Sequence, residues 1–161
     1  MTKTKVKLGS VQETLLITLW ARAVESAKSD RILRDTKSQE ILEQIDYDFS
    51  KLEKAKGTQI GVCLRGLMFD DWVKSFLQEN PSGTIVEIGS GLNTRFERVD
   101  NGQVRWFDLD MPDSMAVRKK YFSETERRKF IASSILDSSW IDAVKEVGYN
   151  PIMFVAEGVL M

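Results

Sequence analysis

The sequence predicts an α/β fold, with a doubly wound, mostly parallel sheet behind a helical N-terminal segment. Residues up to about Gln78 follow helical patterns, whereas from Thr84 onward short apolar runs alternate with helical stretches. Continuous apolar strands separated by helices are typical of parallel sheets that are covered on both faces. We therefore expect residues 1–80 to form a helical cap segment and residues 81–161 to form the α/β part, within one structural domain.

Three helices are expected in the cap segment. The first begins at Ser10, because Ser10 and Glu13 have capping-box spacing. The second covers about residues 35–45 and the third about 60–78, while residues 46–58 fit either a loop or a short helix. Apolar residues at helical spacing predict the buried faces of these helices. These are Leu16, Leu19, Trp20, Ala23, Val24 and Ala27 in the first, Ile41, Leu42 and Ile45 in the second, and Leu64, Leu67, Met68, Val73 and Phe76 in the third.

Four strands are expected after the cap segment, with helices between them. The apolar runs predict strands at residues 84–88, 104–109, 129–133 and 151–156, and helices at about 114–122 and 140–147. The charged run from Ser123 to Lys129 is interpreted as a solvated face. Because the chain stops soon after the fourth strand, we expect the later strands of the sheet to be missing. The unpaired apolar edge should then favour a homo-oligomer, a domain swap or aggregation.

Composition excludes several classes of protein. The chain has 161 residues, of which 42% are hydrophobic and 29% charged, the usual mix of a soluble globular protein. With 23 basic and 24 acidic residues the net charge is −1, so the basic footprint of a nucleic-acid-binding protein is absent. No apolar run reaches the roughly 18 residues of a membrane span. Because Cys63 is the only cysteine, no intrachain disulfide can form, and the cytoplasm is the expected compartment.

Histidine is absent from the sequence. This excludes Ser-His-Asp and Cys-His catalysis, histidine-containing zinc sites and a histidine general base. We expect no metal site, and a cofactor that brings its own reactivity suits such a chain.

Two motifs indicate a ligand site at the carboxyl end of the predicted sheet. The first strand leads through Glu87 into a turn that contains Gly89 and Gly91, and glycines let a ligand approach the backbone closely. Asp110 ends the second strand 19 positions after Gly91, where an acidic residue accepts hydrogen bonds from ribose hydroxyls in nucleotide-binding folds. Asp108 competes for this role, but Asp110 lies nearer the carboxyl end of the strand. The alternative for the glycines is a turn without a ligand, and for Asp110 a turn former beside Pro112.

Two classes of enzyme use this layout. A nicotinamide-binding domain prefers G-x-G-x-x-G, but Thr94 stands at the third glycine position. An acidic residue just before G-x-G, here Glu87, resembles the first motif of class I S-adenosylmethionine-dependent methyltransferases.

The motifs along the whole chain resemble the leucine carboxyl methyltransferase family, in particular its bacterial polyketide-type O-methyltransferase branch. The resemblance implies a Rossmann-like class I methyltransferase fold with strand order 3-2-1-4 in the part present, and S-adenosyl-L-methionine as cofactor. It is carried by five ordered segments: Arg65 with Phe69-Asp70, Val86 to Arg95, Phe107 to Pro112, Ala132 to Trp140, and Ala156 to Met161.

The resemblance also implies roles for single residues. By this likeness Arg65 holds the methionine carboxylate of the cofactor, Gly89 and Gly91 lie under the cofactor, and Asp110 binds the ribose. Glu157 matches the family's glutamate near the methionine part, and Glu87 matches the acidic residue before the glycines.

Ser134 and Ile135 match an Asp-Leu pair beside the adenine. Because a serine replaces the family's aspartate, the contact to the adenine amino group would pass to a backbone group or to Asp137. Arg22 and Lys37 lie in the helical region that closes over the cofactor in this family, but on their own pattern both are expected on a charged helix face.

The implied function is S-adenosylmethionine-dependent transfer of a methyl group to an oxygen, and the expected acceptor is a carboxylate of a small molecule or a peptide terminus. The alternative is a non-catalytic cofactor-binding or assembly fragment that needs a partner chain to complete its fold. The two functions differ in whether the chain transfers methyl groups. The fragment is expected if the half of the domain that binds the methyl acceptor is missing.

Overall fold

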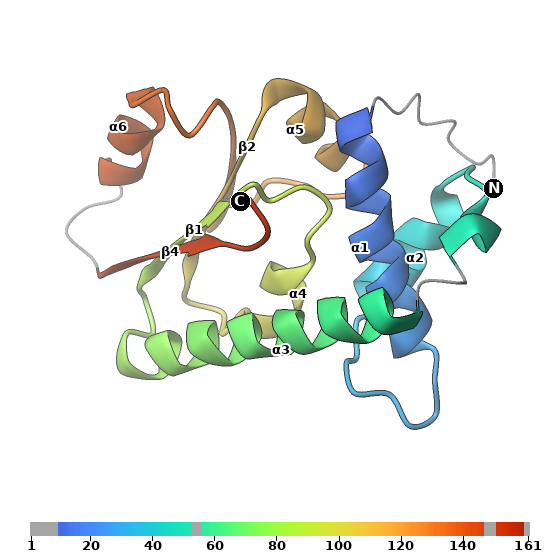
Figure 1. Ribbon diagram of the computed structural model, residues 1–161. Helices are drawn as coiled ribbons and strands as arrows, with labels where there is room; N and C mark the ends of the chain where they lie inside the picture. Colours follow the sequence, from blue (N-terminus) through green and yellow to red (C-terminus); the bar gives the residue numbers. More distant parts are fainter. Residues whose placement is uncertain (1–9, 53–55, 147–150, 160–161) are drawn as a thin grey trace. The chain divides into compact units, whose positions relative to one another are not determined.

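The computed structural model describes residues 10–52, 56–146 and 151–159 (Figure 1). The chain separates into two compact units. The N-terminal unit comprises Met1–Met68 and Leu92–Arg98, and the sheet unit comprises Phe69–Gly91 and Val99–Met161. In the described residues no helix is long and apolar enough to cross a membrane.

The first two helices of the N-terminal unit match the sequence expectation. Helix α1 spans Ser10–Ser26 and α2 spans Thr36–Gln44, and a short 3₁₀ helix follows at Phe49–Leu52. The side chain of Asp35 caps α2 by accepting a hydrogen bond from the Ser38 N–H. The predicted capping-box side chains of Ser10 and Glu13 lie outside the described residues. The expected inward faces are buried except at Ala27, which lies beyond the end of α1 and is exposed, and at Val24 and Leu42, which are half-buried.

Helix α3 begins earlier than expected, and its predicted buried face is only partly confirmed. It spans Lys56–Glu79, and Leu64 and Met68 are about half exposed. Val73 is buried, whereas Leu67 and Phe76 are half-buried. The buried side of α3 instead includes two polar residues, Gln59 and Asp70, at helical spacing with apolar ones. Because the prediction followed apolar residues alone, it missed a face that polar side chains help to form. The buried positions are Gln59, Val62, Cys63, Gly66, Asp70, Val73 and Leu77.

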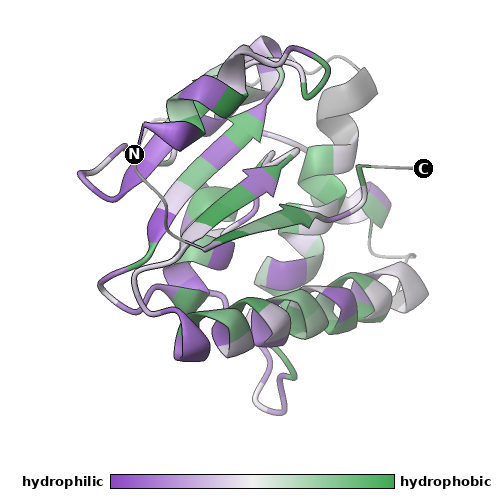
Figure 2. Ribbon diagram, turned by 90° about the vertical axis from the view of Figure 1, so that its left-hand side faces the viewer, coloured by the Kyte–Doolittle hydropathy of each residue, from purple (hydrophilic) through white to green (hydrophobic). Residues whose placement is uncertain are grey.

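The sheet unit contains a four-stranded parallel sheet in the order β3-β2-β1-β4, as the resemblance implied. Figure 2 shows hydrophobic stretches along the strands, interrupted by hydrophilic residues. Its central strand β1 is fully buried, as expected for a parallel sheet with helices on its faces. The strands are β1 (Thr84–Ile88), β2 (Arg105–Asp110), β3 (Arg128–Ala132) and β4 (Ile152–Ala156).

Side chains of β2 alternate between two environments, which places helices on opposite faces of the sheet. Phe107 and Leu109 pack with Trp140 and Val144 of α6, which spans Ser139–Lys145. Trp106 and Asp108 point the other way, towards α5, which spans Pro112–Arg118 and contributes Arg118. The short helix α4 (Arg95–Val99) follows the glycine turn and was not predicted, because five residues carry too little periodicity. Residue 147 and Gly148, the expected end of α6, lie outside the described residues.

The expectation of a solvated face at Ser123–Lys129 is confirmed except at one residue. The run Ser123–Lys129 is not uniformly solvated, because Arg128 is almost completely buried. Trp72 is half exposed and contacts Phe69, whereas Trp106 is buried.

Candidate functional site at the carboxyl edge of the sheet

The glycine turn after β1 is fixed to the neighbouring strand. Gly89 and Gly91 have φ of 65° and 44°, the left-handed region that glycine adopts without strain. The N–H groups of Gly89 and Ser90 both donate to the Leu109 carbonyl oxygen, at 2.8 and 3.2 Å. The turn is therefore held at the end of β2, where ligands bind in sheets of this type.

The carboxylate of Asp110 joins the end of β2 to the same turn. Its Oδ2 accepts a 2.6 Å hydrogen bond from the Gly91 N–H, and its Oδ1 accepts a 2.7 Å bond from the Met111 N–H. Burial raises the pKa of Asp110 above its usual value, although the two backbone N–H groups and the Arg118 charge lower it. Each carboxylate oxygen keeps a second lone pair with which it can accept a bond from a ligand.

A hollow of about 90 Å³ opens beside this carboxylate. It brings together four of the residues that the sequence predicted for the site: Gly89, Asp110, Ser134 and Ile135. The remaining walls are mostly apolar and carry no charge. They are formed by Ile88, Leu109, Met111, Ser133 and Val159. A single acidic group in an otherwise uncharged hollow suits a ligand with hydroxyl groups and a flat apolar part.

Other predicted residues do not line this hollow. Gly91 contacts Asp110 from the turn, whereas Glu87 is buried within β1, in register with Asp108. Glu157 is half-buried just after β4. Arg65 is half-buried on α3 and belongs to the N-terminal unit.

Behind the glycine turn lies a buried charge cluster that the sequence reasoning missed. Arg118 and Arg128 both donate to Asp108, at 2.9 and 2.7 Å, and all three side chains are at most 3% exposed. Arg118 also donates to the carbonyl oxygens of Gly91 and Ser90, at 2.7 and 3.2 Å. Since the Asp108 oxygens receive bonds from these arginines and from the Trp106 Nε1–H, this carboxylate supports the turn and is not the one that faces the hollow.

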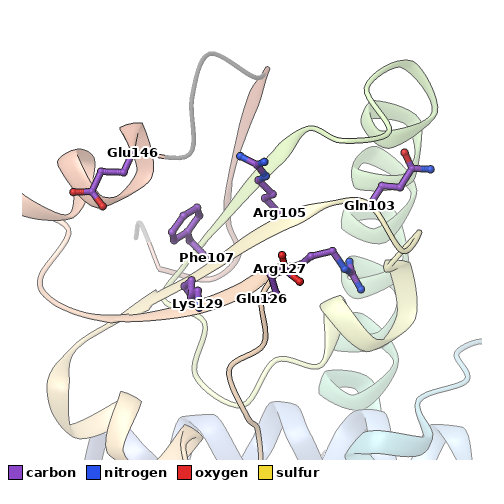
Figure 3. Close-up of a pocket in the computed structure, with 7 residues that line it drawn as sticks. All are labelled: Gln103, Arg105, Phe107, Glu126, Arg127, Lys129 and Glu146. Atoms are coloured by element: carbon purple, nitrogen blue, oxygen red, sulfur yellow. The ribbon is translucent and has the colours of Figure 1, made fainter.

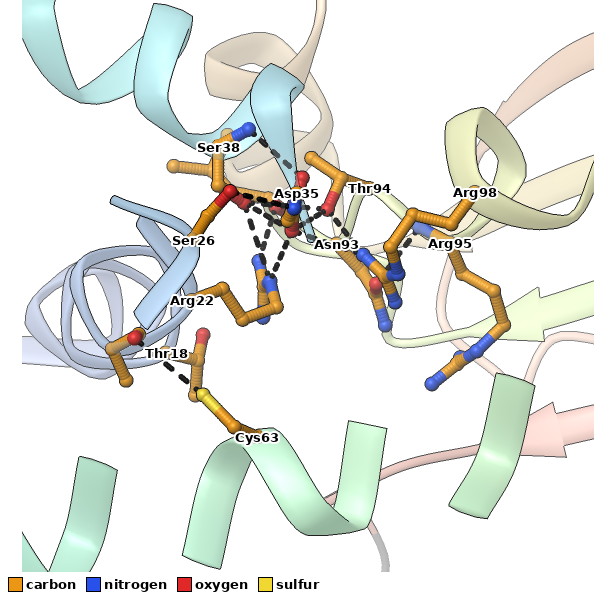
Figure 4. A network of polar contacts seen from close by, with 12 residues as sticks. Thr18, Arg22, Ser26, Asp35, Ser38, Cys63, Asn93, Thr94, Arg95 and Arg98 are labelled. Atoms are coloured by element: carbon orange, nitrogen blue, oxygen red, sulfur yellow. Dashed lines mark hydrogen bonds and ion pairs between the residues drawn. The ribbon is translucent and has the colours of Figure 1, made fainter. Parts of the chain in front are cut away.

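A second charge cluster is contained in the N-terminal unit (Figure 4). Asp35 pairs with Arg22 at 3.1 Å and with Arg98 at 3.0 Å, and it accepts a hydrogen bond from the Thr94 hydroxyl. Arg22 also donates to the Leu92 carbonyl oxygen at 2.9 Å. Arg22 is therefore buried and does not lie on a charged helix face as expected. Lys37 does lie on such a face, where it pairs with Glu40.

Burial alone would raise the pKa of Asp35, but Arg22, Arg98 and the hydroxyls of Ser38 and Thr94 lower it overall. The network thus anchors Leu92–Arg98, the segment directly after the glycine turn in the chain, to α1 and α2.

A larger hollow of about 450 Å³ lies at the amino ends of β2 and β3 (Figure 3). Its walls carry both signs of charge, and Arg127 is engaged by Asp100 in a two-bond ion pair at 2.6 and 2.8 Å. None of the sequence-predicted site residues lines it. Over the described residues, no group of acidic, cysteine or histidine side chains could hold a metal ion.

Comparisons with known proteins found one family model and several relatives that are similar to this chain. A family model described as "Leucine carboxyl methyltransferase" matches residues 15–161. The chain is 34% identical over 155 residues to the "Tetracenomycin polyketide synthesis O-methyltransferase TcmP" of Streptomyces glaucescens, covering 96% of this chain and 57% of that protein.

It is also 29% identical over 171 residues to the "S-adenosyl-L-methionine-dependent methyltransferase dpfgK" of Gibberella zeae, covering 98% of this chain and 57% of that protein. The chain thus spans 57% of the length of these two relatives.

Proposed function

Because the chain belongs to the leucine carboxyl methyltransferase family, we propose that it serves S-adenosyl-L-methionine-dependent O-methylation, with a carboxylate of a small molecule or peptide terminus as acceptor. The observation that carries the proposal is the hydrogen bond between the Gly91 N–H and Asp110, beside the hollow that also holds Ser134 and Ile135. It joins a glycine turn and a carboxylate at the end of a strand, the two features that bind a nucleoside in folds of this type.

The residues around the hollow fit the adenosine part of the cofactor. Asp110 is the acceptor for the ribose hydroxyls, and Ile135 with Met111 offers apolar contact to a base. At Gly89 there is no room for a side chain, since a Cβ there would overlap Val159. In this proposal a backbone group near Ser134, or Asp137, contacts the adenine amino group. The roles that the resemblance implies are kept for Arg65, Glu87, Gly91 and Glu157.

The cofactor, when bound, supplies an activated methyl group, so the protein needs no residue to activate the donor. An ionised carboxylate acceptor likewise needs no general base, which agrees with the absence of histidine. The contribution of this chain is then orientation. Asp110 and the glycine turn fix one end of the cofactor, and fixing reactants in place is worth up to about 7–11 kcal/mol.

The alternative remains a cofactor-binding or assembly fragment that works with a partner chain. One observation favours it: among the described strands, β4 pairs with β1 alone. Phe154 on β4 is 55% exposed and Ile152 beside it is partly exposed. We propose a second copy of this chain as the partner at that edge.

In the proposed domain organisation, residues 1–80 are the cap segment and residues 81–161 are the cofactor-binding half of one domain.

Calorimetric titration with S-adenosylhomocysteine, and with NAD as the contrasting ligand, tests the cofactor assignment. We expect saturable binding of S-adenosylhomocysteine and none of NAD. The variants Asp110→Asn and Arg65→Met should each weaken binding ten-fold or more, since hydrogen bonds to charged groups contribute roughly 1.5–3 kcal/mol. Folded variants that bind as tightly as the parent would overturn the site.

Transfer of a labelled methyl group to small carboxylic acids separates the two functions. Turnover by the 161-residue chain supports the enzyme, whereas cofactor binding without turnover supports the fragment.

A further inference from the structure

The sheet unit buries a group of charged side chains directly behind the glycine turn. Arg118 and Arg128 share the carboxylate of Asp108, and Glu87, which is also buried, lies in register with Asp108 on β1. Buried charge is costly unless it is matched by hydrogen bonds or by charge of opposite sign. Arg118 directs part of that charge at the carbonyl oxygens of Ser90 and Gly91.

We propose that Arg118 is a positioning residue of the cofactor site, holding the glycine turn by its carbonyl oxygens and supplying positive charge beside Asp110. This inference rests on the proposed function, since it concerns the same site. One guanidinium nitrogen, Nη1, bonds both Gly91 and Ser90, while Nη2 bonds Asp108. The fork therefore ties the turn after β1 to the middle of β2.

The orientation of the Arg118 fork is itself fixed from two sides. Asp108 holds Nη2, and the Phe122 ring lies against the guanidinium plane with its centroid 4.3 Å from Cζ. Arg128 lies 5.1 Å from the same ring and holds the other oxygen of Asp108. A planar guanidinium clamped in this way loses little freedom when it bonds the turn.

The electrostatic part of the proposal concerns how easily Asp110 ionises. Burial raises the pKa of Asp110, and Arg118 is the cation that lowers it, while Asp113 on α5 raises it. The other residues that line the hollow around Asp110 are uncharged. Loss of the Arg118 charge should therefore raise the pKa of Asp110 further, so that a larger fraction of the ribose acceptor is protonated in mildly acidic solution.

Nuclear magnetic resonance of the ligand-free protein tests both parts without reference to turnover. The carboxyl carbon of Asp110 is titrated in the parent, in Arg118→Met, in Arg118→Lys and in the matched control Arg128→Met. We expect an upward shift of the midpoint by about one pH unit in Arg118→Met, the scale on which a nearby cation moves a carboxyl. Arg118→Lys, which keeps the charge, and Arg128→Met, which keeps Arg118, should leave the midpoint close to that of the parent.

Amide hydrogen exchange at Gly91 and Leu92 tests the positioning part. Exchange relative to the parent should be several-fold faster in both Arg118 variants, because an ammonium cannot reproduce the planar fork. Circular dichroism establishes that each variant is folded, and should Arg118→Met not fold, Arg118→Lys still tests the turn. An unchanged Asp110 midpoint with unchanged exchange in folded Arg118 variants would overturn the proposal, as would an equal response in Arg128→Met.

S-adenosylhomocysteine binding then links the inference to the proposed function. The affinity for S-adenosylhomocysteine should fall about ten-fold in Arg118→Met. As the pH is lowered, the affinity of this variant should begin to decrease at a higher pH than that of the parent. If the parent binds no S-adenosylhomocysteine while the ligand-free measurements follow the expectation, the proposed cofactor is wrong and Arg118 still positions the turn. If the parent binds and Arg118→Met binds equally well across pH, the inference fails and the proposed function stands.

Discussion

The backbone N–H of Gly91 donates a 2.6 Å hydrogen bond to the side chain of Asp110, which lies 19 positions later in the chain. The other oxygen of the same carboxylate accepts from the Met111 N–H at 2.7 Å. The acidic residue thus orders the glycine turn and the start of α5 at once. Its capacity to bind a ligand is tied to the shape of the backbone around it.

Replacing Asp110 by Asn should weaken S-adenosylhomocysteine binding and change its dependence on pH. Burial raises the pKa of Asp110, so the ionised parent carboxylate is lost as pH falls through that raised value. The affinity of the parent should therefore fall in mildly acidic solution, whereas Asp110→Asn should bind at least ten-fold more weakly at neutral pH with little further change. Calorimetry from about pH 4.5 to 8 measures both.

The stability of the fold should respond in the opposite direction. A carboxyl whose folded pKa is raised stabilises the fold when it is protonated, and this contribution is lost as pH rises through the folded value.

A parent affinity that stays constant down to the pH of unfolding would show that the charge of Asp110 has no part in binding.

Gly89→Ala should destabilise the protein more than the same change at Gly102. Both glycines have positive φ, 65° and 80°, so both variants carry the left-handed strain of roughly 1–2 kcal/mol. Only at Gly89 would the new Cβ also overlap a side chain, that of Val159, since the space beside Gly102 is open. Urea unfolding should give a larger loss for Gly89→Ala, and the added change Val159→Ala should recover part of it. Equal losses at both glycines would mean that the Val159 contact is not a constraint.

The sequence predicted the sheet well because its signals are local. The apolar runs that became β1, β2 and β4 are bounded by turn residues, and the Gly91–Asp110 spacing is readable without a structure. Helix α3 was less predictable, since the polar Gln59 and Asp70 occupy its buried side. Gln59 is accommodated there by a hydrogen bond to Glu25, a partner 34 positions away that no periodicity indicates.

The charge clusters could not be predicted for the same reason. Arg118 and Arg128 lie in stretches rich in charge, where arginines are usually solvated. Their burial depends on Asp108 meeting both in space, which requires the order of the strands and the position of α5. The position of Asp108 inside a strand, between the apolar Phe107 and Leu109, was a signal that buried partners exist.

Cys63 should react slowly with thiol reagents in the folded protein. Its side chain is buried, and burial raises the pKa of the thiol to about 11. Since the thiolate is the reactive form, labelling with a chromogenic disulfide at pH 8 should take much longer than in denaturant. Complete labelling of the native protein within the time of the denatured control would mean that the helix packing around Cys63 opens readily.

Phe154→Lys should weaken self-association of the chain. Phe154 is 55% exposed on β4, and its ring lies against Trp140 with centroids 6.1 Å apart. A charge on an exposed edge strand opposes pairing with another copy. Sedimentation velocity should show an associating parent and a more monomeric variant, with Leu136→Lys, on an exposed loop position, as control. A parent that is already monomeric at high concentration would contradict the proposed copy-to-copy contact at this edge.

Asp35→Asn should cost far more stability than Asp100→Asn, although both carboxylates pair with arginine. Asp35 is buried between Arg22 and Arg98, and removing one partner of a buried ion pair costs about 3–5 kcal/mol, because the remaining charges are left uncompensated. Asp100 pairs with Arg127 at the surface, where such pairs contribute about 0–1 kcal/mol.

The pKa of Asp35 is lowered in the folded state, so its contribution to stability is present above the unfolded pKa of about 3.9 and is lost as pH falls through the folded pKa. Urea unfolding at pH 7 and near pH 3 should therefore show a large difference between parent and Asp35→Asn that shrinks on acidification. A difference that is equally large at both pH values would mean that packing around Asp35, and not its charge, holds Leu92–Arg98 to the first two helices.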